Sequence, residues 1–395
     1  MARIAAFAFD IAEAAQIRRI QSLRAIGHDV VSLSFRRANM NRDFRPDWPD
    51  LPLGVTRNES YLRRLLDLAR ATLRGLRGRQ ILQGTDIWIA RNFDLLVLAI
   101  LLRRLTGRRD VRLVYECLDI HGLFTRDDRV GRTMRWLERR ALARTDLLIV
   151  SSPGFLREYF LPVQGFRGQT ALIENKLWLG TGPDLRPKTA RRAEPDRPLR
   201  LGWVGSLRCA ASLKILAGVA ETLGQGIEIA FYGNVHRHAV PDFDAILAQH
   251  PNMRHFGPYA YPDDLAGIYG ACDLVWAQDL WQRGANSDWL LPNRIYEASY
   301  FGCPSMALKG TETGSRVATD GLGFVVDAAT PEALIAVLTR LSRDEICAVA
   351  DGLLQRPETA FRLMPDDLNR ALAPVTAPER LYDSNIAAMI RTQNS

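Results

Sequence analysis

Short apolar stretches alternate with longer amphipathic stretches along the whole of this 395-residue chain. In the first half, the apolar stretches predict strands at 3–9, 29–35, 86–90, 111–115, 146–150 and 170–173. The stretches between them predict helices, the first of which runs from Asp10 to Ala25 and ends at Gly27. This order of strands and helices predicts a parallel sheet with helices packed on its faces.

The pattern breaks once and then begins again. Residues 181–198 are rich in proline, arginine and other charged residues and poor in apolar ones, so they predict a linker. Beyond them, apolar stretches predict strands at 199–204, 227–232, 253–256, 274–276, 305–308 and 323–326. We therefore expect an α/β fold with two doubly wound, Rossmann-like domains, residues 1–180 and 199–377, facing a central cleft. Ligands would bind at the carboxyl ends of the strands.

Composition narrows the class of protein. A hydrophobic content of 47% is ample for buried cores. The five cysteines are scattered and lack metal-binding spacing, which predicts a reducing cytosol and no structural metal; they are Cys117, Cys209, Cys272, Cys303 and Cys347. The amino-terminal stretch is too short and too weakly apolar for a signal peptide, and no uninterrupted apolar run of about 18 residues predicts a membrane-spanning helix.

The net charge of +8 is concentrated in one segment. Residues 57–79 contain seven arginines, at positions 57, 63, 64, 70, 74, 77 and 79. On a helix, four of these arginines share one face and the leucines lie largely on another, which suits attachment to an anionic membrane surface. A solvated Arg-rich helix whose leucines face the core is the other interpretation. Nucleic acid is disfavoured as a partner because aromatic residues and known binding motifs are missing from the segment.

The segment 290–304 combines a short helix with a carboxylate. Pro292 suits the first turn of a helix, and Gly302 suits its end. Glu297 then lies in mid-helix, where its carboxylate can accept from two adjacent hydroxyls. Asn293 and Arg294 lie one turn earlier, and the free amides of the helix start can receive a phosphate. The alternative is an amphipathic surface helix with an incidental glutamate.

A second phosphate-binding element follows the strand 199–204. Gly205 permits a tight turn, and the helix after it begins close to Arg208 and Lys214. These two cations can reach phosphate oxygens and stabilise a diphosphate leaving group. Alternatively, Arg208 is only a surface loop residue.

The pattern Pro292-x-Arg294-x-x-Glu297, followed by Gly302-x-Pro304, resembles the nucleotide-sugar signature of GT-B glycosyltransferases, especially those of family 4 (group 1). Residues 10–19, with their Asp-x-x-x-x-Ala-x-x-Arg-Arg pattern, resemble the opening of bacterial exopolysaccharide glycosyltransferases of the succinoglycan and xanthan kind. The resemblance implies that Glu297 holds the donor ribose. It also implies that Gly233 and Tyr259 lie near the base.

The chain departs from the family pattern at two positions. Trp289 stands where the family has a second acidic residue, with Asp288 beside it. Ser206 stands where the family usually has an arginine. The role that the family assigns to the second acid is therefore not carried over to this chain.

The loop after the strand 111–115 carries a carboxylate and an imidazole, Asp119 and His121, which are candidates for acceptor activation. The loop resembles one in xanthan-type glucuronosyltransferases, where an aspartate acts as the base. Asp119 as the base implies inversion of the sugar, whereas a sugar contact by His121 alone favours retention. A third interpretation is a helix-capping aspartate beside an ordinary loop histidine. The residues expected on the acceptor side are Asp10, Arg91 and Asp94, with Glu13 near them.

Taken as a whole, the resemblance implies a cytoplasmic hexosyltransferase that is peripherally attached to the inner membrane through the basic helix 57–79. It would transfer a sugar from a nucleotide sugar, preferably a UDP-sugar such as UDP-glucose or UDP-glucuronate, to a lipid-linked oligosaccharide acceptor. Neither a cofactor nor a metal is expected. The resemblance also implies that a helix in residues 378–395 crosses back to the first domain. Two alternatives are an inactive scaffold that binds a nucleotide sugar and a sugar-nucleotide epimerase of the same architecture.

Overall fold

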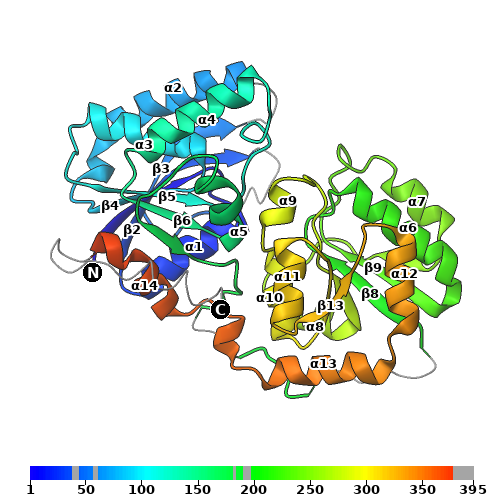
Figure 1. Ribbon diagram of the computed structural model, residues 1–395. Coiled ribbons are helices and arrows are strands. Elements are labelled where there is room, and N and C mark those ends of the chain that lie inside the picture. The colour runs from blue at the N-terminus through cyan, green and yellow to red at the C-terminus, as the bar shows by residue number, and fades with distance from the viewer. Residues whose placement is uncertain (38–43, 57–60, 181–183, 190–196, 377–395) are drawn as a thin grey trace.

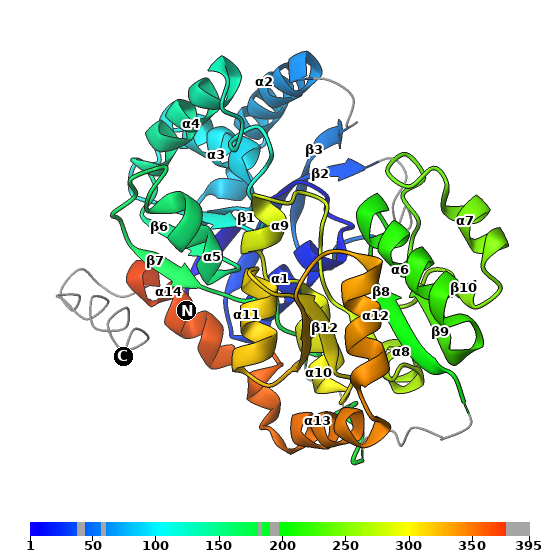
Figure 2. The ribbon, with the colours of Figure 1, turned by 45° about the vertical axis from the view of Figure 1, so that its right-hand side comes forward.

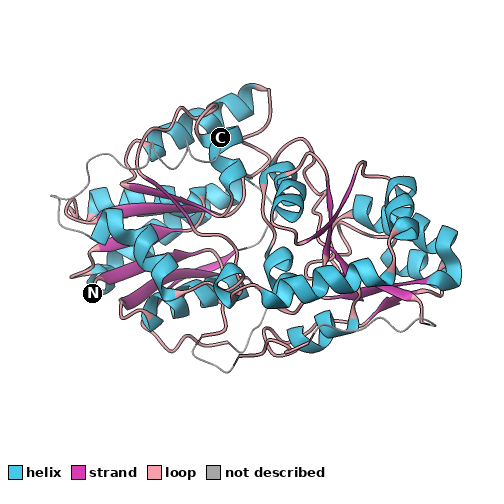
Figure 3. Ribbon diagram, turned by 60° about the horizontal axis from the view of Figure 1, so that its bottom comes forward, coloured by secondary structure: helices cyan, strands magenta, loops and turns pink. Residues whose placement is uncertain are grey.

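The computed structural model describes residues 1–37, 44–56, 61–180, 184–189 and 197–376. Within these residues, two parallel sheets are each packed between helices (Figures 1 and 3). The predicted α/β fold with two Rossmann-like domains is confirmed. All the strands expected from the sequence are present in it.

The first sheet is seven-stranded in the described residues and has the order β3-β2-β1-β4-β5-β6-β7. Its strands are β1 (Arg3–Ala8), β2 (Asp29–Arg37), β3 (Asp50–Thr56), β4 (Ile87–Ala90), β5 (Arg112–Cys117), β6 (Leu147–Val150) and β7 (Thr170–Leu172). Its helices are α1 (Ala14–Ala25), α2 (Tyr61–Arg77), α3 (Phe93–Leu105), α4 (Arg129–Leu142) and the short α5 (Pro153–Phe155), which continues as a π-helical turn at Leu156–Phe160. A 3-10 turn at Arg79–Leu82 precedes β4. Alternate residues of β1 enter opposite cores: Phe7 packs under α3, and Ile4 packs under α1.

The sequence pattern missed the edge strand β3. Pro52 has no N–H to give to a ladder, and Gly54 has a φ of +135°, so the segment lacks the usual strand pattern. It nevertheless pairs with β2 because the edge of a sheet tolerates both residues. The Asp50 carboxylate accepts hydrogen bonds from the hydroxyls of Ser32 and Ser34. A smaller difference concerns α1, which begins at Ala14 rather than at Asp10.

The second sheet repeats the pattern with the order β10-β9-β8-β11-β12-β13. Its strands are β8 (Leu199–Val204), β9 (Ile227–Tyr232), β10 (Met253–His255), β11 (Leu274–Trp276), β12 (Ser305–Leu308) and β13 (Gly323–Val326). Its helices are α6 (Ala210–Leu223), α7 (Phe243–Gln249), α8 (Leu265–Ala271), α9 (Asn286–Trp289), α10 (Asn293–Tyr300), α11 (Glu312–Thr319), α12 (Pro331–Arg340) and α13 (Arg343–Gln355). Two 3-10 turns lie at Gly224–Gly226 and Glu358–Ala360.

The return of the chain to the first domain differs from the prediction. Helix α14 (Pro365–Thr376) lies inside the range assigned to the second domain, yet Leu368 and Leu372 pack against Ile4 and Ile20 of the first (Figure 1). The cause is the apolar stripe of α14, which covers a face of the first sheet. The predicted crossing helix at 378–395 lies outside the described residues.

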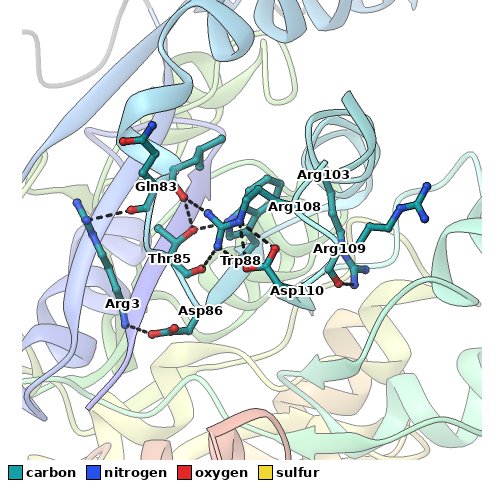
Figure 4. Close-up of polar contacts among 10 residues, drawn as sticks. Arg3, Gln83, Thr85, Asp86, Trp88, Arg103, Arg108, Arg109 and Asp110 are labelled. Atoms are coloured by element: carbon teal, nitrogen blue, oxygen red, sulfur yellow. Dashed lines mark hydrogen bonds and ion pairs between the residues drawn. The ribbon is translucent and has the colours of Figure 1, made fainter. Parts of the chain in front are cut away.

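The two ends of the first sheet have different roles. At the amino ends of β1, β4 and β5, the guanidinium of Arg108 donates to the carbonyls of Leu82 and Thr85 and pairs with Asp110 (Figure 4). The backbone N–H of Arg3 donates to Asp86 at 2.7 Å in the same region. This end is therefore closed by protein contacts. The carboxyl ends of the strands face the second domain and the cleft.

Helices α2, α3 and α4 lie side by side over one face of the first sheet (Figures 1 and 2). Arg57 lies outside the described residues, and the side chains of residues 61–65 are also outside them. In the described part of α2, Ala71 and Thr72 are buried, whereas Leu66 and Leu73 are 57% and 55% exposed. The interpretation in which the leucines face the core therefore does not hold for these two, although Leu68 and Leu76 do pack against it. Arg74 donates to the carbonyl of Leu53, so one predicted surface arginine is tied to β3.

Candidate active site

The cleft between the two domains holds a volume of about 490 Å³, a size suited to a sugar or small ligand. Loops at the carboxyl ends of strands from both sheets form its walls. Its polar lining consists of Glu13, Arg37, Arg91, Asn92, Asp94, Asp119, His121, Arg208, Asp279, Gln282 and Asn286. Its aromatic lining, suited to the faces of sugar rings, consists of Phe9, Phe93, Tyr115, Phe124 and Trp281.

Asp119 lies just beyond β5, and solvent reaches its side chain through the cleft. The amide Nδ2 of Asn286, from the second domain, donates to Asp119 Oδ1 at 2.9 Å. Desolvation by the cleft walls raises the pKa of Asp119, while the hydrogen bond from Asn286 and the charge of Arg208 act to lower it. A carboxylate with a raised pKa that is open to the cleft is suited to accept a proton.

His121 lies two residues further along the same loop and is exposed. Its Nδ1 accepts from the backbone N–H of Leu123 at 3.2 Å, which orients the ring. The structure therefore brings Asp119 and His121 into one cleft. Asp119 is held there by a residue of the opposite domain.

Arg208 lines the cleft from the loop between β8 and α6. One of its terminal nitrogens lies 3.8 Å from Asp279 Oδ2. Asp279, which follows β11, also accepts from the backbone N–H of Trp281 at 2.9 Å and from the hydroxyl of Ser287. Asp279 is thus a carboxylate that the second domain offers to the cleft, and the sequence patterns did not single it out.

Arg91 is largely committed to a buried network beneath the cleft. Its Nε lies 3.0 Å from Glu116 Oε2, and Arg19 pairs with Glu116 Oε1 at 2.6 Å. Glu116 is 1% exposed. Burial by itself would raise the pKa of Glu116, but the guanidiniums of Arg19 and Arg91 outweigh it and lower the pKa. We therefore assign Arg91 a structural part in holding α1 against β5, in addition to its place at the cleft wall.

Eight predicted site residues are not among those that line this cleft: Asp10 and Lys214, and the six on the second domain at 205, 233, 259, 293, 294 and 297 that are described below. Asp10 is fully buried, and its Oδ1 accepts from the N–H of Ala12 in the turn before α1. Lys214 is exposed on α6 and is not among the residues that line the cleft, because Leu213 and Leu216 turn the opposite side of the helix inward. Asp94 does line the cleft.

The two glycine loops at the ends of β8 and β9 are joined. A Cβ on Gly233, whose φ is +130°, would lie 1.9 Å from the carbonyl oxygen of Gly205. The N–H of Leu207 donates to the carbonyl of Asn234 at 3.0 Å, which adds a short bridge between the loops. Glycine is therefore required for the close approach, and both loops present backbone at the sheet edge.

The helix α10 begins and ends as the sequence predicted. Pro292 stands at its N-cap, and Gly302, with a φ of +72°, follows its C-cap. The N–H of Cys303 donates to the carbonyl of Ala298 at 2.8 Å and that of Gly302 to Ser299 at 3.1 Å, the pattern of a Schellman motif. This local geometry sets the position of Glu297.

Glu297 is 5% exposed and accepts from the Tyr269 hydroxyl at 3.0 Å. Arg18, from α1 of the first domain, approaches its carboxylate at 4.0 Å and donates to the Tyr261 hydroxyl at 2.6 Å. Burial raises the pKa of Glu297, and Arg18 opposes this rise. Arg18 therefore covers Glu297 from across the domain boundary, a contact that sequence spacing could not reveal.

Two other predicted donor residues, Arg294 and Tyr259, lie close enough to Glu297 to interact with its charge. Arg294 donates to the carbonyl of Trp276, and a Cβ on Gly205 would lie 4.0 Å from its guanidinium. Asn293 is half-buried at the start of α10. Tyr259 is also half-buried, and desolvation followed by the charge of Glu297 raises its pKa. The structure brings this group together on the second domain.

Trp289 and Asp288 do not offer an acid to the cleft. The Trp289 ring packs on the core of the first domain, stacked on Tyr159, and its carbonyl accepts from the Ser152 hydroxyl. Asp288 pairs with Arg283 at 3.3 Å and lines a separate cavity with Arg157 and Glu312. Asp288 therefore lines that cavity and not the cleft that holds Asp119.

Neither a metal cluster nor a membrane span is found within the described residues. No group of three or more His, Cys, Asp or Glu side chains is placed to hold a metal ion there. Among the same residues, no helix has both the length and the apolar character that crossing a membrane requires. Independence from metal and cofactor stays a prediction.

Comparisons with known proteins indicate the family to which the chain is similar. The family described as "Glycosyl transferase 4-like domain" matches residues 18–176. The chain is 37% identical to the succinoglycan biosynthesis protein ExoL of Rhizobium meliloti (strain 1021) over 346 residues, which cover 87% of this chain and 85% of that protein.

Solved structures show the same fold at low sequence identity. Sucrose-phosphate synthase from Thermosynechococcus elongatus superposes with a TM-score of 0.72 at 13% identity, covering 94% of this chain and 98% of that one. HepE of Anabaena, in complex with UDP and glucose, gives a TM-score of 0.65 at 15% identity with the same coverage of both chains. The GT-B arrangement expected from the sequence is confirmed.

Proposed function

Because the chain belongs to the family of glycosyltransferases that includes the succinoglycan biosynthesis protein ExoL, we propose that it transfers a sugar from a UDP-sugar to a lipid-linked oligosaccharide in exopolysaccharide assembly. The observation that carries the proposal is Glu297, a buried carboxylate held by Tyr269 at the carboxyl edge of the second sheet. Exopolysaccharide assembly is taken from the name of the 37% identical relative.

The donor site is assigned to the second domain. Glu297 accepts the two ribose hydroxyls once Arg18 moves away from it. The joined loops at Gly205 and Gly233 let the donor approach their backbone, and Arg208 neutralises the diphosphate. A UDP-sugar is favoured because the structurally similar HepE has been solved with UDP and with UDP-glucose. The sugar itself is proposed as glucose or glucuronate.

The transfer step is assigned to the residues that line the cleft. An acceptor hydroxyl gives its proton to Asp119 as its oxygen forms a bond to the anomeric carbon of the donor sugar. The bond between that carbon and the phosphate oxygen breaks, and UDP leaves with the electron pair beside Arg208. Attack from the side of Asp119, opposite the diphosphate, inverts the anomeric centre. Asn286 donates to Oδ1 of Asp119, so Oδ2 is the oxygen that takes the proton.

The membrane surface is assigned to α2 and α4 of the first domain. Exposed apolar side chains on these helices include Leu66, Leu73, Val130, Trp136 and Leu137. Exposed arginines stand among them, at 70, 77, 129, 132 and 140. This mixture of apolar and basic groups suits an anionic lipid surface, near which each basic residue contributes about 1 kcal/mol. It would hold the cleft close to an acceptor anchored in the membrane.

Thermal unfolding with UDP, GDP and their sugar conjugates tests the donor site. We expect UDP at about a hundred times its dissociation constant to stabilise the protein by about 2.7 kcal/mol. Glu297→Ala should remove most of this stabilisation. Glu221→Ala, which changes an exposed glutamate on α6 of the same domain, is the matched control and should keep it. A full response to UDP in Glu297→Ala would overturn the assignment of Glu297 to the donor site. A response to GDP alone would show that the donor nucleotide carries guanine and not uracil.

A further inference from the structure

Asn286 links the two domains at the point where the proposed chemistry takes place. It begins α9 in the second domain and is 5% exposed. Its partners, Asp119 and Ile120, belong to the loop after β5 in the first domain. The side chain therefore spans the domain boundary inside the cleft wall.

The two hydrogen bonds define the orientation of the Asn286 amide. The backbone N–H of Ile120 can only donate, and it lies 2.7 Å from Oδ1 of Asn286. The amide nitrogen then faces Asp119 and donates to Oδ1 of its carboxylate at 2.9 Å. Both distances are those of well-formed hydrogen bonds. One amide thus fixes the backbone and the carboxylate of the same loop.

We propose that Asn286 is a positioning residue for transfer, which orients the Asp119 carboxylate only while the two domains are in contact. This inference rests on the proposed role of Asp119 as the base. The Asp119 carboxylate is then oriented at the moment when the domains come into contact, because the amide that orients it belongs to the second domain. Opening of the cleft releases the carboxylate from this geometry.

The charged surroundings of Asp119 explain why a neutral amide is needed at position 286. Arg208 faces Asp119 from the loop before α6, Asp279 from the loop after β11 and Glu13 from the turn before α1. Two of these three groups are carboxylates that oppose the ionised form of Asp119. A further acid at position 286 would add to this repulsion, whereas an amide N–H stabilises the carboxylate and adds no charge.

A second asparagine, Asn175, serves as a control because it links the two domains without contacting Asp119. Nδ2 of Asn175, near the end of the first domain, donates to the carbonyl of Leu291 at 3.1 Å. This contact also crosses the domain boundary, but Asn175 is not among the residues that line the active-site cleft. Loss of a tie alone would affect the Asn175 and Asn286 variants alike. Loss of positioning would affect only the Asn286 variants.

The test measures the titration of Asp119 directly, by 13C NMR of aspartate carboxyls, with its signal assigned by its disappearance in Asp119→Asn. Asn286→Asp keeps the size of the side chain and an acceptor for Ile120, but it replaces the donor to Asp119 by a carboxylate. We expect the pKa of Asp119 to rise by on the order of one unit in Asn286→Ala and further in Asn286→Asp, and to be unchanged in Asn175→Ala.

Turnover gives the second readout, with UDP-glucose as the donor and a bacterial membrane lipid extract as the acceptor. We expect kcat to fall about a hundredfold in Asn286→Asp, with an unchanged dissociation constant for UDP. The acid limb of the rate profile should move to higher pH, because a base with a raised pKa loses its proton only at higher pH. An unshifted Asp119 titration in both Asn286 variants would overturn the inference, as would an equal shift in Asn175→Ala.

A different result would contradict the proposed role of Asp119 as the base. Full turnover by Asp119→Asn would show that Asp119 is not the base, whatever the Asn286 variants do. Loss of turnover in Asp119→Asn together with normal Asp119 titration in Asn286→Asp would leave the base in place and remove only the role of Asn286.

Discussion

Two of the contacts between the domains, at Asn286 and at Arg18, involve different kinds of group. At Asn286, a neutral amide from the second domain binds the loop of the first domain through hydrogen bonds of 2.7 and 2.9 Å. At Arg18, a cation from the first domain approaches the buried Glu297 of the second at 4.0 Å and stacks over the Tyr261 ring at 4.5 Å. The first contact leaves the Asp119 carboxylate open to the cleft, whereas the second covers a carboxylate.

The difference separates the two parts of the proposed reaction. A contact that directs a carboxylate without covering it can persist while substrate is bound. A contact that occupies the partner of the ribose hydroxyls must yield to the donor. The charge of Arg18 is also suited to keeping Glu297 ionised while the site is empty. The ion pair between Arg19 and Glu116 supports both contacts, since Arg18 adjoins Arg19 on α1 and Asp119 lies three residues after Glu116 of β5.

The largest expected effect is on stability and comes from removing the charge of Glu116. Glu116→Gln leaves the guanidiniums of Arg19 and Arg91 buried without their counter-charge. We expect the free energy of unfolding to fall by about 3–5 kcal/mol, measured by urea denaturation at pH 7. Because the folded pKa of Glu116 is depressed, its contribution is present above its ordinary pKa of 4.5 and disappears as the pH falls through the folded value.

Asp327→Asn is the control for this change, since it removes a carboxylate paired with Lys309 at the surface. We expect an effect of about 0–1 kcal/mol there. A loss of similar size in Glu116→Gln would show that the buried network contributes little to the stability of the first domain. The network around Glu116 would then not be what supports the contacts of both Arg18 and Asp119.

The next effect concerns the Arg18 contact alone. In Arg18→Ala the pKa of Glu297 rises further, so a larger fraction of this carboxylate is protonated at neutral pH. We expect the dissociation constant for UDP, measured by calorimetry, to increase as the pH falls from 8 to 6, by up to about tenfold per unit below the new pKa. The wild-type protein should show a weaker dependence.

Arg24→Ala provides the control on the same helix, because Arg24 pairs with Asp47 inside the first domain. We expect its UDP affinity to match that of the wild type at each pH. Tighter binding of UDP by Arg18→Ala at pH 6 would reverse our assignment, since Arg18 would then only compete with the ribose for Glu297.

The smallest effect tests whether the outer surface is independent of both contacts. Trp136, 49% exposed on α4, lies beneath the guanidinium of Arg140 at 4.7 Å. Trp136→Ser and Arg140→Ser should each weaken binding to vesicles of phosphatidylglycerol and phosphatidylethanolamine by about 1 kcal/mol in a sedimentation assay. The response to UDP should stay unchanged.

A similar pair on the second domain serves as the control. Phe256 is 43% exposed and lies beneath Arg254 at 5.3 Å. Phe256→Ser should leave vesicle binding unaffected. Equal losses for Phe256→Ser and Trp136→Ser would indicate that exposed aromatic groups bind lipid without regard to the surface that carries them.

The features predicted correctly from sequence were set by local chemistry. The alternation of apolar stretches gave the strands of both sheets, and the proline and glycine around α10 gave its bounds. Each of these signals lies within a few residues of the element that it defines. The edge strand β3 was missed for the same reason, because Pro52 and Gly54 give the local signal of a loop.

The features missed from sequence depend on partners far along the chain. Asn286 lies 167 residues from Asp119, and Arg18 lies 243 residues from Tyr261. Asn286 belongs to no motif, and the pattern over residues 10–19 that includes Arg18 does not indicate its partner, so only the folded structure shows these contacts. The position of Lys214 failed for another reason, since the phase of α6 is set by the burial of its leucines and not by the charge that a phosphate would need.

The return of the chain through α14 places two crossings between the domains side by side. The N–H of Leu177, on the outward crossing, donates to the carbonyl of Phe361, and the N–H of Leu363, on the return, donates to the carbonyl of Leu177, both at 2.9 Å. The two segments that connect the domains are thus adjacent and hydrogen-bonded to each other. Relative motion that pulls the two crossings apart would break these two hydrogen bonds, whereas rotation about the crossings would leave them intact. We expect a cleft that opens by such a rotation to bring Asn286 back to the same loop when it closes.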